Sequence, residues 1–334
     1  MSDLRVGILG LGQMGRKHLR VFEMLEGVQV VAVGDAIGDP EKIAKGIPLA
    51  KNAEELIEHN LDMCVIAIPT VHHLEAALVM ADAGVHTLIE KPIASNTVEA
   101  DTLIDVFRKS GLVCCVGHVE RFNPAVSEMK KRLLDGELGD VFQIVTRRQG
   151  PFVNRVRDVG VIKDLGTHDI DLSMWLINDS ISAVSARTAH TMGREHEDLA
   201  VITSHFFNGV IGNHLVNWVS PFKDRLVQVT GENGCFIADT INADLTFWKN
   251  GSIQSDWDTL LHARGISEGD VIRFAIEKHE PIFVEAQAFR DAVLGIRDDC
   301  VTLEEARSVI QVAESCLQSS AKGETEVIIN KLSS

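Results

Sequence analysis

The glycine-rich run of residues 6–15, VGILGLGQMG, constrains the fold of this 334-residue chain more than any other stretch. Its first four residues are all apolar, which is typical of a strand covered on both faces, as in a parallel sheet. Gly10, Gly12 and Gly15 follow in G-x-G-x-x-G spacing, and residues 13–25 predict a helix. A strand that turns into a helix through this spacing predicts a dinucleotide-binding unit.

Each glycine of this run has a predicted mechanical task. Gly10 permits a tight turn, Gly12 lets a pyrophosphate approach bare backbone, and Gly15 lets the helix pack close to the strand. The free N–H groups at the helix start, around Gln13 and Met14, would hold the phosphates together with the helix dipole. The alternative is a glycine turn without a ligand, because the motif alone is weak evidence.

Asp35 lies twenty residues beyond Gly15, at the end of a second apolar run. An acid at this place accepts hydrogen bonds from the adenosine ribose in NAD-binding domains. Residues 36–39 contain no Arg or Lys, and Asp39 is itself acidic. A 2′-phosphate would therefore be repelled, which favours NAD over NADP as the cofactor. The alternative is that Asp35 only shapes a turn.

Apolar runs and helical stretches alternate up to residue 122, which predicts a doubly wound parallel sheet. Strands are predicted at 28–33, 61–68, 86–90 and 112–116, and helices at 74–83 and 97–110, with another helix starting from Asp39 as N-cap and Pro40 as first residue. Ligands bind at the carboxyl ends of the strands in such sheets. Pro69, Thr70, Glu90, Lys91 and His118 follow predicted strand ends, so we expect them on the cofactor side.

Lys91 is the residue of this half with the greatest catalytic interest. It follows an apolar run, stands next to Glu90, and precedes Pro92, which restricts the backbone of the residue before it. These neighbours predict a lysine of restrained direction, whereas the alternative is an ordinary solvated loop lysine.

After Phe122 the pattern changes, so the predicted domains are residues 1–122 and 123–334. The second domain is predicted to be α+β, with helices at 124–134, 284–294 and 303–322, a strand at 141–148 and an antiparallel meander over 181–249. Asn-Gly pairs at 208–209, 233–234 and 250–251 are strong hairpin signals. Thr302 and Glu305 have the spacing of a capping box.

Asp164, His168 and Asp171 lie three and four residues apart, so on a helix they share one face. A carboxylate beside an imidazole holds its tautomer and raises its basicity, which suits a general base near neutral pH. The alternatives are an acid that caps a structural helix and a pair of metal ligands.

A basic cluster precedes this segment, with five cations in seventeen residues of a chain whose net charge is −16. Its members are Arg147, Arg148, Arg155, Arg157 and Lys163, and the acid among them is Asp158. Guanidinium forks suit phosphate oxygens, so the cluster predicts a phosphate-bearing substrate. The alternative is a solvated loop face.

Composition excludes several classes. The sequence has no tyrosine, which excludes a Tyr–Lys acid/base pair. Its six cysteines form no C-x-x-C pair, which predicts reduced thiols and no metal. The acidic charge argues against nucleic acid and anionic membranes as partners. The first strand begins by Leu4, which leaves no room for a signal peptide, and no apolar run approaches a membrane span, so we expect a cytoplasmic protein.

Taken together, these motifs resemble the Gfo/Idh/MocA family, the glucose–fructose oxidoreductase and inositol dehydrogenase group. The marks are the glycine run, Pro69 with His73 four residues later, Glu90-Lys91-Pro92, and Asp164 with His168 and Asp171. The resemblance implies a Rossmann domain, followed by an α+β domain whose large open, mainly antiparallel sheet usually builds a homodimer or homotetramer. It also implies NAD(P)-linked oxidation or reduction of a sugar carbon. Lys91 and His168 would be the catalytic pair, Asp164 would orient His168, and Glu90 would lie near the nicotinamide ribose.

A narrower likeness is to UDP-N-acetylglucosamine 3-dehydrogenases, which implies a nucleotide-sugar substrate whose secondary hydroxyl is oxidised. It is carried by segments such as those around His118, Arg121 and Asn123. Beside the catalytic residues, the predicted cofactor contacts are Gly10, Gly12, Gln13, Met14, Gly15, Asp35, Pro69, Thr70, His73, Glu90, Lys91, His118 and Arg121, and the predicted substrate contacts are Asn123, Arg147, Arg148, Arg155, Arg157, Lys163 and Asp171. The rival functions are a free-sugar or inositol dehydrogenase and a non-catalytic NAD-binding regulator.

Overall fold

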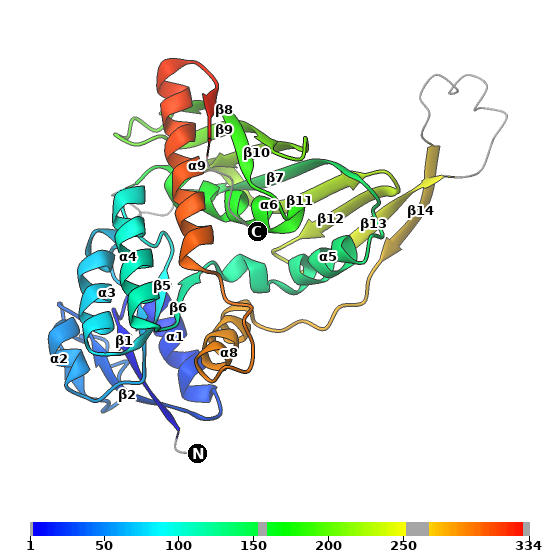
Figure 1. Ribbon diagram of the computed structural model, residues 1–334. Helices are drawn as coiled ribbons and strands as arrows, with labels where there is room; N and C mark the ends of the chain where they lie inside the picture. Colours follow the sequence, from blue (N-terminus) through cyan, green and yellow to red (C-terminus); the bar gives the residue numbers. More distant parts are fainter. Residues whose placement is uncertain (1–2, 153–158, 252–266, 330–334) are drawn as a thin grey trace. The chain divides into compact units, whose positions relative to one another are not determined.

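The computed structural model describes residues 3–152, 159–251 and 267–329. The chain divides into two compact units, which Figure 1 shows in colours that follow the sequence. Unit 1 contains Met1–Phe122 and His279–Gln311, and unit 2 contains Asn123–Lys278 and Val312–Ser334. The first division coincides with the boundary predicted after Phe122. Residues 279–311 were expected in the second domain, whereas their contacts place them in unit 1.

Unit 1 is built on a parallel sheet of six strands within the described residues, in the order β3-β2-β1-β4-β5-β6. The strands are β1 (Leu4–Leu9), β2 (Val28–Gly34), β3 (Leu49–Ala50), β4 (Met63–Ile66), β5 (His86–Glu90) and β6 (Cys114–Gly117). The order reverses between β1 and β4, which is where ligands bind in doubly wound sheets. The predicted parallel sheet is therefore confirmed.

Helices cover both faces of this sheet, because successive strand residues point to opposite sides. Ile8 packs with Phe22 and Phe289 on one face, while its neighbour Leu9 packs with Leu103 on the other. The first face carries α1 (Gln13–Met24) and α8 (Pro281–Val293), and the second carries α2 (Ala53–Ile57), α3 (His73–Asp82), α4 (Thr97–Ser110) and the first turns of α9 (Leu303–Lys322). Two further short helices are η1 (Thr70–His72) and η2 (Val119–Phe122).

Two predicted helix starts in unit 1 have opposite outcomes. The prediction of a helix after Asp39 was wrong, because residues 39–47 form turns in which Lys42 and Lys45 take positive φ angles of 55° and 48°. Asp39 does cap this turn, since its carboxylate accepts the N–H groups of Ile43 and Ala44. The capping box is confirmed at the start of α9: Glu305 accepts from the N–H of Thr302 at 2.9 Å, and Thr302 Oγ1 accepts from the N–H of Glu305 at 3.2 Å.

Unit 2 contains a large mixed sheet, with nine strands among the described residues in the order β14-β13-β12-β11-β7-β10-β9-β8-β15. The strands are β7 (Val141–Pro151), β8 (Ile181–Ala189), β9 (Leu199–Phe206), β10 (Ile211–Asn217), β11 (Val219–Gly231), β12 (Gly234–Asp239), β13 (Asp244–Gly251), β14 (Ser267–Arg273) and β15 (Glu326–Val327). The sheet is mainly antiparallel, as expected, but it is not a simple meander. Strand β7 lies between β10 and β11 and runs parallel to β10.

The Asn-Gly signals located two of three turns in this sheet. Asn208-Gly209 joins β9 to β10, and Asn233-Gly234 joins β11 to β12, both as antiparallel pairs. The third pair does not form a turn, because Asn250 and Gly251 are the last two residues of β13 and pair with β14. A pair of residues reports only local turn preference, and here cross-strand pairing with β14 overrides it.

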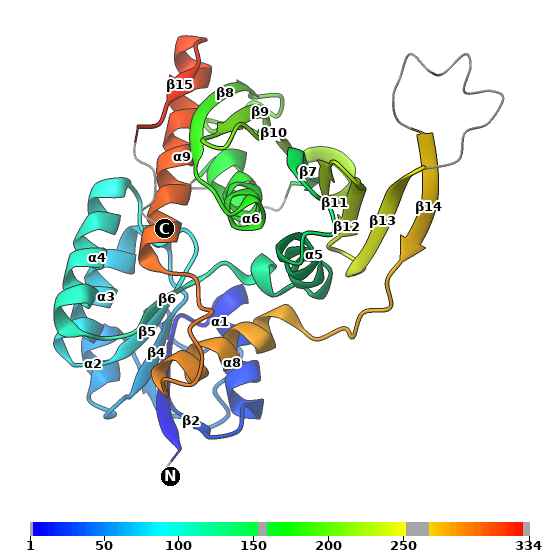
Figure 2. The ribbon, with the colours of Figure 1, turned by 45° about the vertical axis from the view of Figure 1, so that its right-hand side comes forward.

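One face of the large sheet packs against α5 (Pro124–Leu134) and α6 (Thr167–Ile177), as Figure 2 shows. Along β10, Gly212, His214 and Val216 point to the helices and are buried. Ile211 and Leu215 point to the opposite face, which we call the open face. Among the described helices of the chain, none combines the length and apolar character needed to cross a bilayer.

Candidate functional site

The glycine loop between β1 and α1 has the geometry that a dinucleotide needs. Gly10 has a φ of +99°, and a Cβ atom there would lie 2.4 Å from the carbonyl oxygen of Ala67. A Cβ atom on Gly15 would lie 1.8 Å from the carbonyl oxygen of Gly10, so α1 packs directly on the turn. At Gly12 an added Cβ meets no atom of the described chain within 4 Å. Gly12 is also the N-cap of α1 and gives that helix no side-chain cap, so the helix start suits a phosphate.

Asp35 follows β2 beside this loop and shapes the turn, which is one of the two roles that the sequence left open. One carboxylate oxygen accepts the N–H of Ile37 at 2.8 Å, which shapes the turn, and the other accepts the N–H of Leu11 at 2.8 Å. Each oxygen can accept a further bond, so a ribose hydroxyl remains compatible with this geometry. The nearby Arg16, which sequence reasoning missed, is paired with Glu41 at 2.6 Å. This pairing and the acids around it favour NAD at this position over NADP.

Glu90 is the buried centre of the site at the end of β5. Its Oε1 lies 2.7 Å from Nε2 of His18 on α1, and its Oε2 accepts the N–H of Lys91 at 3.2 Å. Burial raises the pKa of Glu90, but the hydrogen bond and charge of His18 and the charge of Lys91 outweigh it, so the pKa is lowered. Glu90 is therefore a carboxylate. A Cβ atom on Gly117 would lie 3.2 Å from Oε2 of Glu90, so glycine leaves space for this carboxylate.

Sequence reasoning missed two buried residues whose electrostatics are linked to this carboxylate. His18 is fully buried, and its Nδ1 has no hydrogen-bond partner among the described residues. Glu285 of α8 is also buried, and burial followed by the charge of Glu90 raises its pKa well above the usual range. His18 could have been found in the sequence as a histidine on the sheet-facing side of a predicted helix.

His73 was expected to contact the cofactor, and the structure corrects this expectation. It is 1% exposed, at the start of α3. Nδ1 lies 3.0 Å from the carbonyl oxygen of Pro92, and Nε2 lies 2.9 Å from that of Ile68. Burial lowers the pKa of His73, although the two carbonyl contacts and the charge of Glu90 oppose this. The imidazole therefore bridges two loops of unit 1 instead of presenting a free nitrogen to a ligand.

The remaining predicted contacts of unit 1 fall into two groups. Pro69 is exposed, and Thr70 and Lys91 are half-buried at strand ends, so their contact with the cofactor stays a prediction. His118 is buried, and the buried Arg121 pairs with Glu305 of α9 at 2.6 Å. The Arg121 guanidinium thus stabilises the packing of α9 in unit 1, which favours a structural role over the predicted cofactor contact.

In unit 2, the segment with Asp164 and His168 is helical from end to end. Its first turn is a π-helix, η3 (Ile162–Gly166), and α6 follows at once, so the N-cap position of α6 is Gly166 and not Asp164. Asp164 therefore does not occupy the N-cap position of α6, although it lies in the first turn of this helical segment. Asp164 and His168 are half-buried, whereas Asp171 is 1% exposed.

Neighbouring strands fix where this helical segment begins and how it lies. Glu197, just before β9, is buried and accepts the N–H of Ile162 at 3.0 Å. Arg148 of β7 donates from Nε to Oδ1 of Asp169 at 2.7 Å, and each of these side chains is 2% exposed. A buried ion pair one residue after His168 holds this part of α6 against the sheet.

The described members of the predicted basic cluster do not form one patch. Arg147 and Arg148 are neighbours on a strand, so they point to opposite faces. Arg147 lies on the open face and pairs with Asp224 at 3.1 Å, and Arg148 is committed to Asp169. Lys163 is half-buried in η3, while Arg155 and Arg157 lie outside the described residues.

Asn123 is also placed differently from the substrate contact that was predicted. Its Oδ1 accepts the N–H of Ala125, so it caps α5, and its Nδ2 donates to the carbonyl oxygen of Thr240 at 2.9 Å. The side chain is buried, and both ends are used within unit 2. This geometry favours a structural role.

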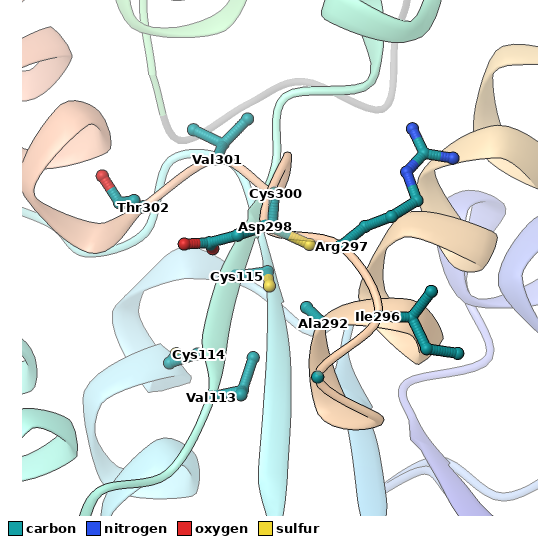
Figure 3. A pocket seen from close by; sticks show the side chains of 11 residues that line it. Val113, Cys114, Cys115, Ala292, Ile296, Arg297, Asp298, Cys300, Val301 and Thr302 are labelled. Carbon is teal, nitrogen blue, oxygen red and sulfur yellow. The ribbon is translucent and has the colours of Figure 1, made fainter.

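A hollow of about 520 Å³ lies in unit 1 between β6 and the segment that joins α8 to α9 (Figure 3). Cys115, Cys300 and Thr302 line it, with Arg297 and Asp298 at the connecting segment. A hydrogen bond with Cys300, followed by burial, raises the pKa of Cys115 well above its usual range. The lining contains no residue from the predicted cofactor or substrate contacts, so the hollow does not extend the site.

Comparisons with known proteins agree with this architecture. A family model described as an oxidoreductase family with an NAD-binding Rossmann fold matches residues 4–118, and a GFO/IDH/MocA C-terminal domain model matches residues 126–237.

Individual relatives resemble the chain over nearly its whole length. The scyllo-inositol 2-dehydrogenase (NAD(+)) of Bacillus subtilis is 26% identical and covers 96% of this chain and 95% of its own. The UDP-N-acetylglucosamine 3-dehydrogenase of Acidithiobacillus ferrooxidans is 27% identical over 87% of this chain and 94% of its own. A solved structure of that enzyme superposes with a TM-score of 0.82 at 25% identity, covering 96% of this chain and 98% of the other.

Proposed function

This chain belongs to the GFO/IDH/MocA family of oxidoreductases and is an NAD-dependent dehydrogenase of sugars or polyols. On that premise, we propose that its substrate is a nucleotide sugar. The best candidate reaction is oxidation of UDP-N-acetylglucosamine to its 3-keto derivative. The observation that carries this choice is the likeness to the UDP-N-acetylglucosamine 3-dehydrogenase, which holds at 25% identity over 96% of the chain with a TM-score of 0.82.

The proposed mechanism uses one residue from each unit. When bound, NAD supplies the nicotinamide that accepts the hydride of the substrate carbon. His168 takes the hydroxyl proton as the C–H bond breaks, and Asp164 orients the imidazole. Lys91 donates a hydrogen bond to the same oxygen and stabilises its developing negative charge until the carbonyl has formed. The convergence of Lys91 and His168 on one oxygen is a prediction of this mechanism.

The surroundings of Lys91 support its part in this mechanism. Lys91 directly follows Glu90, whose carboxylate is held by His18. Both residues lie at the carboxyl end of β5, on the edge of the sheet where the glycine loop opens. A lysine that only solvates a loop needs no such support. The half-buried position of His168 is likewise suited to a base that must reach a substrate.

A free polyol is the second candidate substrate, and one observation favours it. Two of the five cations expected to bind a phosphate are engaged elsewhere, since Arg148 is buried against Asp169 and Arg147 pairs with Asp224. The nucleotide-sugar proposal therefore depends on Lys163, Arg155 and Arg157 for recognition of the diphosphate.

We also propose that the chain forms a homo-oligomer through the open face of the large sheet. Two pairs of exposed apolar side chains lie there: Val201 (49% exposed) and Ile211 (40%) on the neighbouring strands β9 and β10, and Trp248 (46%) and Val271 (49%) on the neighbouring strands β13 and β14. Exposed apolar surface of this extent supports association. Light scattering should give the mass of an oligomer, and Val201→Glu combined with Ile211→Glu should lower it to that of one chain.

The catalytic test measures NADH formation with UDP-N-acetylglucosamine, UDP-glucose and myo-inositol in parallel. Turnover with a UDP-sugar supports the proposal, whereas turnover with myo-inositol alone establishes the polyol alternative. His168→Ala should keep NAD affinity and lower single-turnover rates by about a hundred- to ten-thousand-fold. Full turnover in this variant would remove His168 from the mechanism. No NADH formation with any sugar would indicate a non-catalytic regulator.

Lys163→Met is the matched substitution for substrate recognition. If Lys163 binds the diphosphate, this variant should raise KM for the UDP-sugar and leave kcat and NAD affinity unchanged. An unchanged KM would contradict a phosphate contact at this residue.

A further inference from the structure

We propose that His73 is a positioning residue, which fixes the turn that carries Lys91 through a hydrogen bond from Nδ1 to the carbonyl oxygen of Pro92. The inference rests on the catalytic role proposed above for Lys91. It assigns a task to a side chain that does not face a ligand, and it explains why a buried polar group stands at the start of α3.

The ring of His73 lies between two strand ends. Ile68 follows β4 and Pro92 follows β5, and the two imidazole nitrogens lie 2.9 and 3.0 Å from their carbonyl oxygens. The ring is 1% exposed, so water does not compete for these contacts. Because Pro92 is bonded directly to Lys91, the Nδ1 contact limits the backbone that directs the lysine side chain.

The other side of the turn is held as well. Nε2 of His18 lies 2.7 Å from Glu90, and Glu90 in turn accepts the N–H of Lys91 at 3.2 Å. The backbone of Lys91 is therefore held at the residue before it by His18 and at the residue after it by His73. With both neighbours anchored, the Cα–Cβ direction of Lys91 is fixed and only its four side-chain torsions remain to place the ammonium, which contributes to the preorganisation that transition-state stabilisation requires.

The two carbonyl contacts differ in what they should do for catalysis. A carbonyl oxygen only accepts, and a neutral imidazole carries a single N–H, so only one of the two contacts is a hydrogen bond, and the proposal places the proton on Nδ1. The contact from Nδ1 acts on the residue after Lys91, whereas the contact from Nε2 acts on Ile68, which is remote in sequence from the lysine. Loss of the Nδ1 contact should therefore reduce catalysis, and loss of the Nε2 contact should affect stability alone.

A matched pair of substitutions separates these contacts. In His73→Asn the amide nitrogen occupies the place of Nδ1, and in His73→Gln it occupies the place of Nε2. We expect similar losses in melting temperature for both. We expect kcat of His73→Asn within about threefold of the wild type and kcat of His73→Gln lower by about tenfold or more, because small misplacements near a reacting centre have effects of this size. KM and NAD affinity should be unchanged in both variants.

Hydrogen exchange gives a readout that does not depend on turnover. The peptide that spans residues 88–96 should exchange faster in His73→Gln than in His73→Asn. Equal losses of kcat in the two variants, or equal exchange in this peptide, would overturn the positioning role. If the wild type forms no NADH with any sugar, the proposed function fails, and the exchange difference still decides whether His73 holds the turn.

Discussion

His214 gives a prediction whose size follows from the structure. It is fully buried on β10, with Nδ1 3.0 Å from Oγ1 of Thr146 and Nε2 3.0 Å from Oγ of Ser204. A hydroxyl can donate or accept, so a neutral imidazole is satisfied on both sides. Burial lowers the pKa of His214 from its ordinary 6.5 to about 4. Because β10 also packs against η3, the titration acts on the sheet beneath Asp164.

The sign of the effect follows from this depressed pKa. The unfolded chain takes up the proton as the pH falls through 6.5, whereas the folded chain does so only near pH 4. Stability contributed by neutral His214 is thus fully present above pH 6.5 and is lost between about pH 6.5 and 4. At about 1.4 kcal/mol per pH unit, the loss is about 2 kcal/mol at pH 5 and about 3 kcal/mol at pH 4.

The assay is urea unfolding of the wild type and of His214→Gln at a series of pH values from 7 to 4.5, followed by tryptophan fluorescence. Other groups titrate in both proteins, so the quantity of interest is the difference in unfolding free energy between them. Between pH 7 and 5, the wild type should lose about 2 kcal/mol more unfolding free energy than His214→Gln. His205→Gln, at an exposed position on the neighbouring strand, is the matched control. A difference that stays flat with pH would refute the reasoning.

Three further predictions follow from contacts described above. Gly15→Ala should lower the melting temperature and weaken NAD binding, because its Cβ would clash with backbone at 1.8 Å, whereas Gly12→Ala should keep the melting temperature and lose NAD affinity, as measured by calorimetric titration. Arg148→Met should cost about 3–5 kcal/mol in urea unfolding, because it leaves the buried Asp169 without its ion-pair partner, and a loss below 1 kcal/mol would contradict this account. Burial raises the pKa of Glu285 in the folded chain, so the wild type loses stability as the pH rises from the pKa of the unfolded chain toward that of the folded chain. Glu285→Gln should therefore be at least as stable as the wild type at pH 7 and above. A less stable variant would show that the fold requires the ionised form.

Much of unit 1 could be predicted because its signals are local. The glycine spacing located a strand, a turn and a helix, and the structure shows backbone approaches at Gly10 and Gly15 that only glycine allows. Apolar runs predicted the parallel sheet, since strands buried on both faces need uninterrupted apolar residues. The helix after Asp39 failed because a good N-cap marks a possible start and not the residues that must propagate the helix, and Lys42 and Lys45 leave helical backbone there.

Long-range pairing accounts for what the sequence did not reveal. Some residues that are adjacent in sequence lie apart in the fold. Arg147 and Arg148 were predicted in one basic cluster, but they lie on opposite faces of the sheet because successive strand residues alternate in direction. Residues far apart in sequence met, as His18 did with Glu90. The strand β7 entered the sheet between β10 and β11, which no hairpin signal could indicate.

The sequence by itself thus determined the kind of unit, the cofactor and the strand ends where chemistry belongs, because turn glycines and apolar periods act over a few residues. The tertiary structure decided which polar side chains are available to a ligand. His73, Arg121, Asn123 and Arg148 all looked like binding residues, and each is buried against groups of its own unit. Most buried donors and acceptors are paired within the protein, and only the folded chain shows where those partners lie.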